Sequence, residues 1–119
     1  MAVATMTQSC TQDIIYEVVD YIDANYNENI NLSELSSRFY ISTYYLSRTF
    51  KKVVGCTFNE YLNEVRILAA KDYLESSNYS VSRISELCGY ESLTHFGRMF
   101  KRLTESSPRQ YKMTMLVNN

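Results

Sequence analysis

Hydrophobic residues recur at helical spacing from residue 12 almost to the end of the chain. Over about 12–25, apolar side chains three and four positions apart share one face, and acidic residues lie largely between them. Such spacing predicts an amphipathic helix. Residues 1–11 lack the pattern, and we expect them to form a disordered leader. The apolar positions of the first helix are Ile14, Ile15, Val18, Val19, Tyr21 and Ile22.

Helix-capping residues divide the rest of the chain. Asn31 with Glu34 and Thr57 with Glu60 have the spacing of capping boxes, and Gly55 is placed to end a helix. The sequence therefore predicts an all-α fold of about seven helices. After the first, the expected helices are about 32–39, 43–54 after Ser42, 57–75, 81–88, a helix from Ser92 through Leu103, and a last helix opened by Ser107, Pro108 and Gln110.

The composition agrees with one helical domain. The chain has 119 residues, of which 45% are hydrophobic and 21% charged, as is typical of a globular domain with a core. One proline and three glycines leave few turn-forming residues for a fold of many short strands.

A repeat at a spacing of 50 residues is the most informative pattern. The segment LSRTFKKVVGCTFNEY (46–61) aligns with FGRMFKRLTESSPRQY (96–111), and upstream the spacing becomes 49 because the second copy has one extra residue in its turn. Each copy is a short helix, a turn and a longer helix, the arrangement in which the second helix enters the major groove of DNA. The matched pairs include Arg48 with Arg98, Phe50 with Phe100, Lys51 with Lys101, Lys52 with Arg102 and Tyr61 with Tyr111.

Two such units joined by a long helix resemble the DNA-binding domain of the AraC/XylS family of bacterial transcription regulators. The resemblance covers about 12–112, with a first unit over about 12–55, a connecting helix over 57–75, a second unit over about 80–112 and then a tail, 113–119. It is carried by the phrases SRTFKK and GRMFKR together with Leu35, Ser36, Ser42, the run 46–55, Arg66, Ile67, Ala70, Leu74, Ile84, Ser85, Gly89, Tyr90, the run 96–102, Pro108 and Tyr111.

Five positions depart from the usual pattern of that family. Ser36 and Ser85 stand where Ala is usual, and Lys112 stands where Arg is usual. Gly97 replaces a usual Ser or Thr, and Glu105 replaces a usual Gly. The last two bear on the strength of the second half-site contact, not on the fold.

The resemblance implies a sequence-specific regulator that binds double-stranded DNA through the second helix of each unit. Because Leu46 and Phe50 take the core side of the first of these helices, its opposite face is left for DNA. Arg48 is the best base reader, since arginine can bond guanine O6 and N7 together. The expected contact residues are Ser42, Thr43, Tyr44, Ser47, Arg48, Lys51 and Lys52 in the first unit, and Ser92, Leu93, Thr94, His95, Arg98, Lys101 and Arg102 in the second.

Within these two sets the roles differ. Lys51, Lys52, Lys101 and Arg102 lie toward the C-terminal half of each helix and are interpreted as phosphate contacts. For Arg48 and Arg98 the alternative is a surface charge paired with Glu64 or Glu91, but their recurrence at equivalent repeat positions favours base reading. Two choices stay open: His95 reads a base or contacts the acidic surface, and one of Tyr44 and Tyr45 packs while the other faces DNA.

Charge is distributed unevenly along the chain. The total is 12 Lys and Arg against 13 Asp and Glu, a formal net charge of −1. Residues 1–30 hold five acids and no base, whereas residues 31–119 hold all 12 bases against eight acids. This asymmetry is compatible with a nucleic-acid face in the body of the chain, and equally with a mixed solvated surface.

The sequence offers little for catalysis, metals or membranes. There is one histidine, and the three cysteines, Cys10, Cys56 and Cys88, are too far apart for a CxxC metal site, so we expect no catalytic residue, no metal and no cofactor. No apolar run approaches the ~18 residues of a membrane span, and no signal peptide is visible, so a cytoplasmic location is expected. Two alternatives are a helical protein-binding module acting through its acidic first helix, and an alkyl-acceptor repair protein, which would need a cluster of four cysteines.

We expect the partner to be an asymmetric promoter site, read in two successive major grooves by a monomeric module, with RNA polymerase as a further partner. Nearly every residue belongs to the DNA-binding unit. Any sensor or dimerisation domain would therefore lie outside this chain, which is either a small regulator acting alone or the C-terminal half of a longer one.

Overall fold

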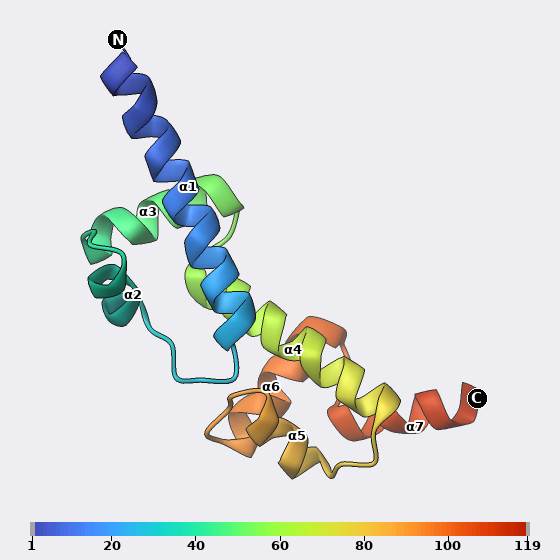
Figure 1. Cartoon of the computed structure of the whole chain (residues 1–119). Helices are drawn as coiled ribbons and strands as arrows, with labels where there is room; N and C mark the ends of the chain where they lie inside the picture. Colours follow the sequence, from blue (N-terminus) through green and yellow to red (C-terminus); the bar gives the residue numbers. More distant parts are fainter. Residues whose placement is uncertain (1, 119) are drawn as a thin grey trace. The chain divides into compact units, whose positions relative to one another are not determined.

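The computed structural model describes the backbone of residues 2–118 and the side chains of residues 12–117. Within this part the chain is all-helical, as expected, and no strand occurs (Figure 1). Its helices are α1 (Ala2–Asn25), α2 (Leu32–Arg38), α3 (Thr43–Val54), α4 (Phe58–Ser76), α5 (Val81–Leu87), α6 (Leu93–Thr104) and α7 (Pro108–Asn118).

The capping residues act at the predicted positions. The side-chain oxygens of Asn31, Ser42 and Ser92 each accept the backbone N–H three residues further on, at 2.8, 3.1 and 3.2 Å. Each bond satisfies one of the N–H groups that a helix leaves without an internal partner. Ser107 and Gln110 form the reciprocal capping box, with bonds of 3.1 Å in both directions, directly around the N1 proline.

Two ends of the fold differ from the sequence-based expectation. The first helix begins at Ala2 and not near residue 12, where the apolar pattern predicted its start. The stretch before residue 12 contains no glycine or proline, the two residues that oppose a helix most strongly. At the other end, α7 continues through the expected tail to Asn118.

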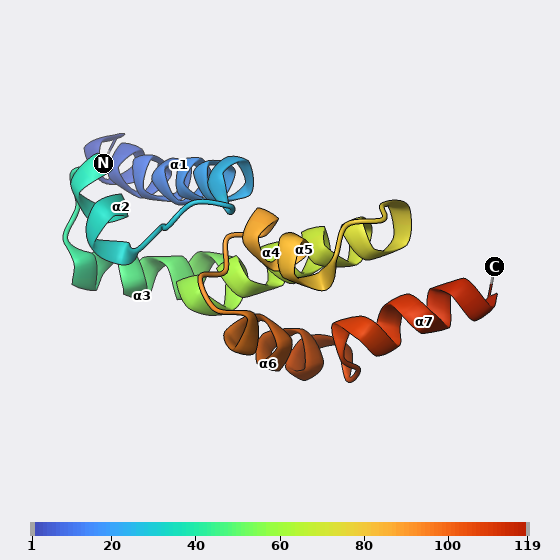
Figure 2. The same ribbon diagram turned by 90° about the horizontal axis from the view of Figure 1, so that it is seen from below.

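The chain divides into two compact units, one of Met1–Asn25 with Asn29–Leu62 and one of Tyr26–Glu28 with Asn63–Asn119. In the first unit, α1 and α2 both lie against α3 (Figure 2). The ring of Phe50 sits at the centre and meets Phe58 and Tyr61 edge-on, with centroids 6.3 and 5.9 Å apart. The buried apolar residues of this unit are Ile15, Val18, Ile22, Ile30, Leu35, Leu46, Phe50, Phe58 and Leu62.

The second unit has its own core, to which α4, α5 and α6 contribute. Cys88 is fully buried, and this burial raises the pKa of its thiol to about 12, so Cys88 acts as a small buried hydrophobe. Tyr111 of α7 packs edge-on against Phe100 at 5.5 Å. The buried cluster comprises Ile67, Ala70, Leu74, Ile84, Cys88, Tyr90, Phe96 and Phe100.

Candidate nucleic-acid interface

Each unit presents one strongly amphipathic helix of twelve residues. Helix α3 buries Leu46 and Phe50, and α6 buries Phe96 and Phe100 at the equivalent repeat positions. Because the buried residues are four apart, they share one face, and the opposite face of each helix turns toward solvent. All fourteen residues predicted as DNA contacts are exposed, on these two helices or at their N-caps.

The base-reading candidate of α3 is held by its own helix. The Arg48 Nη1 donates to the hydroxyl of Tyr44, one turn away, at 3.2 Å, and the guanidinium lies 5.5 Å from the centroid of that ring. Tyr44 is 71% exposed and Tyr45 48%, so Tyr44 is the tyrosine that lies more fully on the outer face. Within the side chains that the structure describes, Arg48 forms no ion pair, and the alternative pairing with Glu64 is not made.

Hydroxyl groups at the start of α3 already make hydrogen bonds within the first unit. The Ser36 Oγ donates to the carbonyl of Ser33 at 2.9 Å, and it lies 3.1 Å from the Thr43 Oγ1. Either hydroxyl can be the donor of the bond between Ser36 and Thr43. The serine at the position where the family usually has Ala therefore gives the Thr43 hydroxyl a hydrogen-bond partner within the first unit.

Helix α6 repeats this face with different side chains. Leu93 is 51% exposed at its first position, and the exposed Arg98 has no ion-pair partner among the described side chains, so the pairing with Glu91 is not made either. The ring of His95 stands edge-on to that of Tyr90, with centroids 5.3 Å apart. A Cβ at Gly97 would meet nothing within 4 Å, so the departure from the usual Ser or Thr leaves open space on this face.

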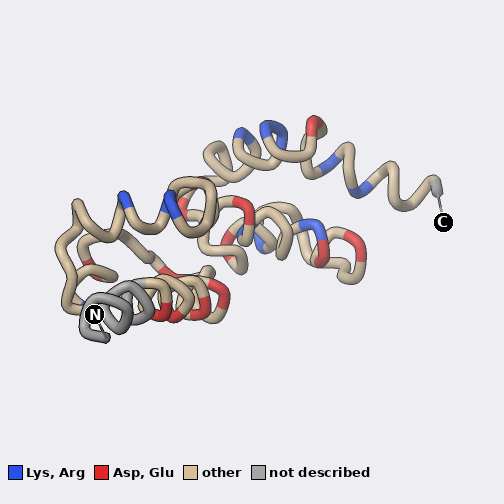
Figure 3. The backbone as a smooth tube through the Cα atoms, turned by 90° about the horizontal axis from the view of Figure 1, so that it is seen from above, with Lys and Arg blue, Asp and Glu red and all other residues tan. Residues whose placement is uncertain are grey.

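The charge on both helices has a single sign. Lys51 and Lys52 lie in the last turn of α3, Lys101 and Arg102 lie in the last turn of α6, and neither helix contains an acid (Figure 3). Basic residues in a last turn interact favourably with the negative end of the helix dipole, so their position alone does not indicate DNA binding. Exposed bases on two repeated helices that contain no acid are nevertheless what a phosphate backbone needs.

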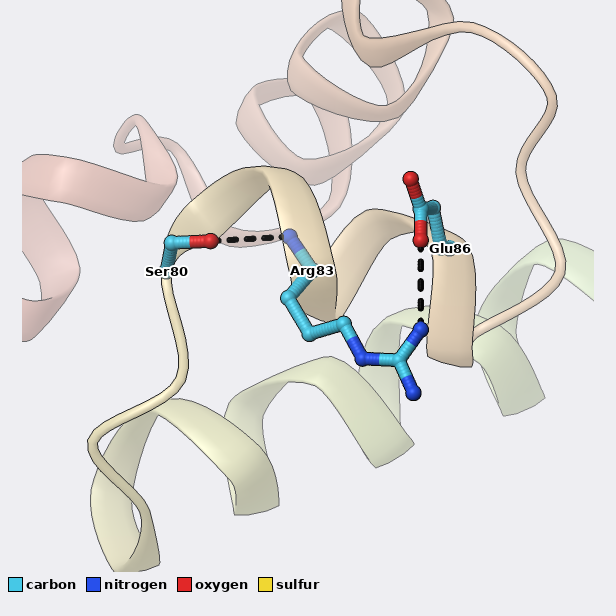
Figure 4. A network of polar contacts seen from close by, with 3 residues as sticks. All are labelled: Ser80, Arg83 and Glu86. Atoms are coloured by element: carbon cyan, nitrogen blue, oxygen red, sulfur yellow. Dashed lines mark hydrogen bonds and ion pairs between the residues drawn. The ribbon is translucent and has the colours of Figure 1, made fainter.

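The basic residue of α5 shows the contrasting case. Arg83 Nη1 donates to the Glu86 carboxylate at 3.2 Å, and the Arg83 backbone N–H donates to the N-cap Ser80 at 3.1 Å (Figure 4). Both charged side chains are more than half exposed, so the ion pair contributes little to stability. It does neutralise Arg83, which leaves the free positive charge of this helix-turn-helix on α6.

Four acidic residues lie along α1 without a basic residue between them, and one of them has a structural use (Figure 3). The Tyr61 hydroxyl donates to the Asp23 carboxylate at 2.7 Å. Burial, followed by this hydrogen bond, raises the pKa of Tyr61 to about 12, so the tyrosine stays a donor. The bond ties α1 to the start of α4 within the first unit.

Sequence reasoning missed two features. Tyr40 is 93% exposed with φ 58°, a backbone conformation that favours glycine, and the repeat places it opposite Gly89 with φ 94°. The alignment of Tyr40 with Gly89 in the repeat was the sequence signal from which a positive φ at Tyr40 could have been predicted. The second is the set of contacts behind His95, in which a buried Tyr90 and Arg66 take part; it joins segments far apart in the sequence and has no local signal.

The described residues hold no group of three or more His, Cys, Asp or Glu that could bind a metal ion. The Cys10 side chain lies outside the described part. None of the described helices is long and apolar enough to cross a membrane.

Comparison with known proteins gives the family. A family model described as a helix-turn-helix domain matches residues 35–114. The chain is 36% identical over 106 residues to the uncharacterized HTH-type transcriptional regulator YijO of Escherichia coli, covering 89% of this chain and 38% of that protein. It is 35% identical to the bifunctional transcriptional activator/DNA repair enzyme AdaA of Bacillus subtilis, over 80% of this chain and 45% of AdaA. It therefore spans less than half the length of these relatives.

A solved structure supports the same conclusion. The DNA-binding domain of AdpA, a global transcriptional factor, in complex with a target DNA superposes with a TM-score of 0.84 at 28% identity, covering 88% of this chain and 95% of that domain. That structure contains the AdpA domain bound to its target DNA. The chain therefore belongs to the AraC-type helix-turn-helix family and is a DNA-binding domain of a transcription regulator.

Proposed function

We propose that this chain reads an asymmetric promoter site in double-stranded DNA as a monomeric module, with α3 and α6 entering two successive major grooves. The observation that carries the proposal is the recurrence of an exposed arginine, Arg48 and Arg98, at equivalent positions of two acid-free helices whose opposite faces are buried. Neither arginine forms an ion pair with any side chain among residues 12–117. The other side chains of the two helices differ, so the two half-sites should differ as well.

In this proposal the fourteen contact residues divide by chemistry. Arg48 and Arg98 bond the major-groove edge of guanine, while Thr43, Tyr44, Ser47, Leu93, Thr94 and His95 shape the pockets around them. Lys51, Lys52, Lys101 and Arg102 neutralise phosphates. The hydroxyls of Ser42 and Ser92 accept helix N–H groups and keep one hydrogen to donate to a phosphate.

The setting of this activity belongs to the proposal. DNA recognition takes place in the bacterial cytoplasm, and RNA polymerase is the partner through which a bound regulator would act. The chemistry described above uses no cofactor and no catalytic group. Sensing and dimerisation would be supplied by other parts of a longer regulator, or replaced by control of the amount of this chain.

Selection of bound sites from random duplexes tests the proposal directly. We expect one asymmetric site with two half-sites about 10 bp apart. Inserting 5 bp between them should abolish two-headed binding, because it turns one half-site to the far side of the duplex. Equal binding of the original and the extended sites would contradict the reading of successive grooves.

Salt dependence tests the phosphate contacts separately. If six to eight basic side chains meet phosphates, log K should fall with log salt at a slope of about −5 to −7. A flat salt response, or equal affinity for every duplex, would show that the chain does not read DNA.

A further inference from the structure

Tyr90 is fixed in the interior of the second unit although it lies next to the DNA-facing helix. Its side chain is 4% exposed, and its hydroxyl donates to the Asn63 Oδ1 at 2.7 Å. The guanidinium of Arg66 lies 5.3 Å from the centroid of its ring. A ring held by burial, by a hydrogen bond at its tip and by a cation on its face has one orientation.

Arg66 is held just as firmly. It is 9% exposed, and its Nε and Nη2 donate to the carbonyl oxygens of Tyr26 and Glu28, each at 2.8 Å. Gly89 leaves the room for this arrangement, since a Cβ there would lie 2.7 Å from the Tyr26 carbonyl oxygen and 3.1 Å from the Arg66 Nε. The support of Tyr90 is therefore a packed network within the second unit and not a single contact.

His95 packs against the Tyr90 ring from the solvent side. It is exposed, it lies in the first turn of α6, and its imidazole meets Tyr90 edge-on at 5.3 Å with an interplanar angle of 84°. Its backbone N–H is bound by the N-cap Ser92 at 3.2 Å. An exposed side chain that is braced by a buried ring has fewer orientations to lose when it binds.

The first unit lacks this arrangement. At the repeat spacing, Tyr90 corresponds to Ile41 and His95 corresponds to Tyr45. The turns are otherwise built alike, because Ile41 and Tyr90 both donate their backbone N–H to the equivalent serine carbonyl, at 3.0 and 3.1 Å. The contact between His95 and Tyr90 is thus not required by the helix-turn-helix fold, and it distinguishes α6 from α3.

We propose that Tyr90 is a positioning residue for DNA reading, which orients the His95 imidazole so that α6 recognises the major-groove edge of a purine. A ring N–H of His95 would donate to the purine N7, or to guanine O6. The inference rests on the proposed function. It assigns to His95 the role of a base reader, and it assigns to a buried residue without DNA contact a share of the specificity.

The experiment uses the fact that His95 is the only histidine of the chain. In the proton NMR spectrum of the full chain, every imidazole signal belongs to His95, so its ring protons need no further assignment. We expect an NOE between these protons and a tyrosine ring, and a displacement of the Hε1 signal from that of free histidine. Loss of the ring in Tyr90→Leu should return the signal toward the free position. Tyr111→Leu, which removes a partly buried tyrosine from the same unit, should not.

DNA binding supplies the second readout. On the site selected by the wild type, His95→Ala should lose preference at one base pair by roughly fivefold or more. Tyr90→Leu should lose preference at the same base pair, and the double variant should lose no more than His95→Ala alone, because one residue acts through the other. Tyr90→Phe keeps the ring and should keep the preference.

Each outcome decides between the possibilities. Selective binding that Tyr90→Leu leaves unchanged, or additive losses in the double variant, would overturn the role of Tyr90 alone. Failure of the wild type to prefer any duplex would overturn the proposed function and this inference with it. If Tyr90→Leu does not fold, the NOE in the wild type remains decisive, since its absence means that the two rings are not in contact.

Discussion

Two glycines share a backbone conformation but not an environment, and this difference predicts unequal costs of substitution. Gly55 has φ 97° at the end of α3, and Gly89 has φ 94° in the turn after α5. A Cβ at Gly55 would meet nothing within 4 Å. At Gly89 it would lie 2.7 Å from the carbonyl oxygen of Tyr26 and 3.0 Å from the Cα of Asn27, both of them backbone atoms.

The magnitudes follow from these contacts. A left-handed conformation costs an L-residue about 1–2 kcal/mol, and replacing glycine by alanine returns about 0.4–1 kcal/mol through the unfolded state. Gly55→Ala should therefore destabilise the chain by roughly 1 kcal/mol. Gly89→Ala carries the same cost plus about 1–3 kcal/mol for overpacking, since backbone must move and the Arg66 hydrogen bonds with it. Its total is about 2–4 kcal/mol.

Urea unfolding followed by circular dichroism measures both values, and Gly97→Ala is the matched control. Gly97 lies within α6 and also has open space around it, so alanine there should stabilise the helix by about 1 kcal/mol. The decisive quantity is the difference between Gly89→Ala and Gly55→Ala. Equal costs would mean that residues 26–28 do not pack against the turn at Gly89, and the network behind Tyr90 would have to be abandoned.

Three further predictions concern other parts of the chain. Arg48→Ala should lose about 1–3 kcal/mol of binding on the selected site and relax one base pair, whereas Lys52→Ala should weaken all duplexes alike; equal losses on specific and random DNA would contradict the division of roles. Tyr40→Gly should stabilise the chain by roughly 0.5–1 kcal/mol in urea unfolding, because it relieves a positive φ and removes an exposed ring without packing, and a loss of stability would reveal a contact for that ring. Stability should fall as pH rises from about 9 toward 12, because Cys88 and Tyr90 keep their protons in the folded chain after the unfolded chain has lost them. Burial raises the pKa of Cys88 from 9.0, and that of Tyr90 from 10.0, to about 12. Urea midpoints that are flat over this range would refute the burial of both groups.

Much of this protein is determined by short-range sequence. The helix starts at Asn31, Ser42, Thr57 and Ser92 follow from side chains that bond the N–H groups of their own first turn, and this chemistry needs no distant partner. The repeat gave the two reading helices and their exposed faces, because a helical period fixes which side chains share a face. The start of α1 escaped prediction, since it has neither a cap signal nor an apolar stripe before residue 12.

Only the tertiary structure decided which of these residues support one another. The Thr43–Ser36 bond, the brace of His95 on Tyr90, and the capture of the 26–28 carbonyls by Arg66 join positions between five and 40 residues apart. No periodicity records such pairs, because each depends on how helices pack and on the room that Gly89 leaves. The sequence by itself thus determined which faces of α3 and α6 are exposed and proposed for DNA, and the packing behind these helices decided how side chains such as His95 are held.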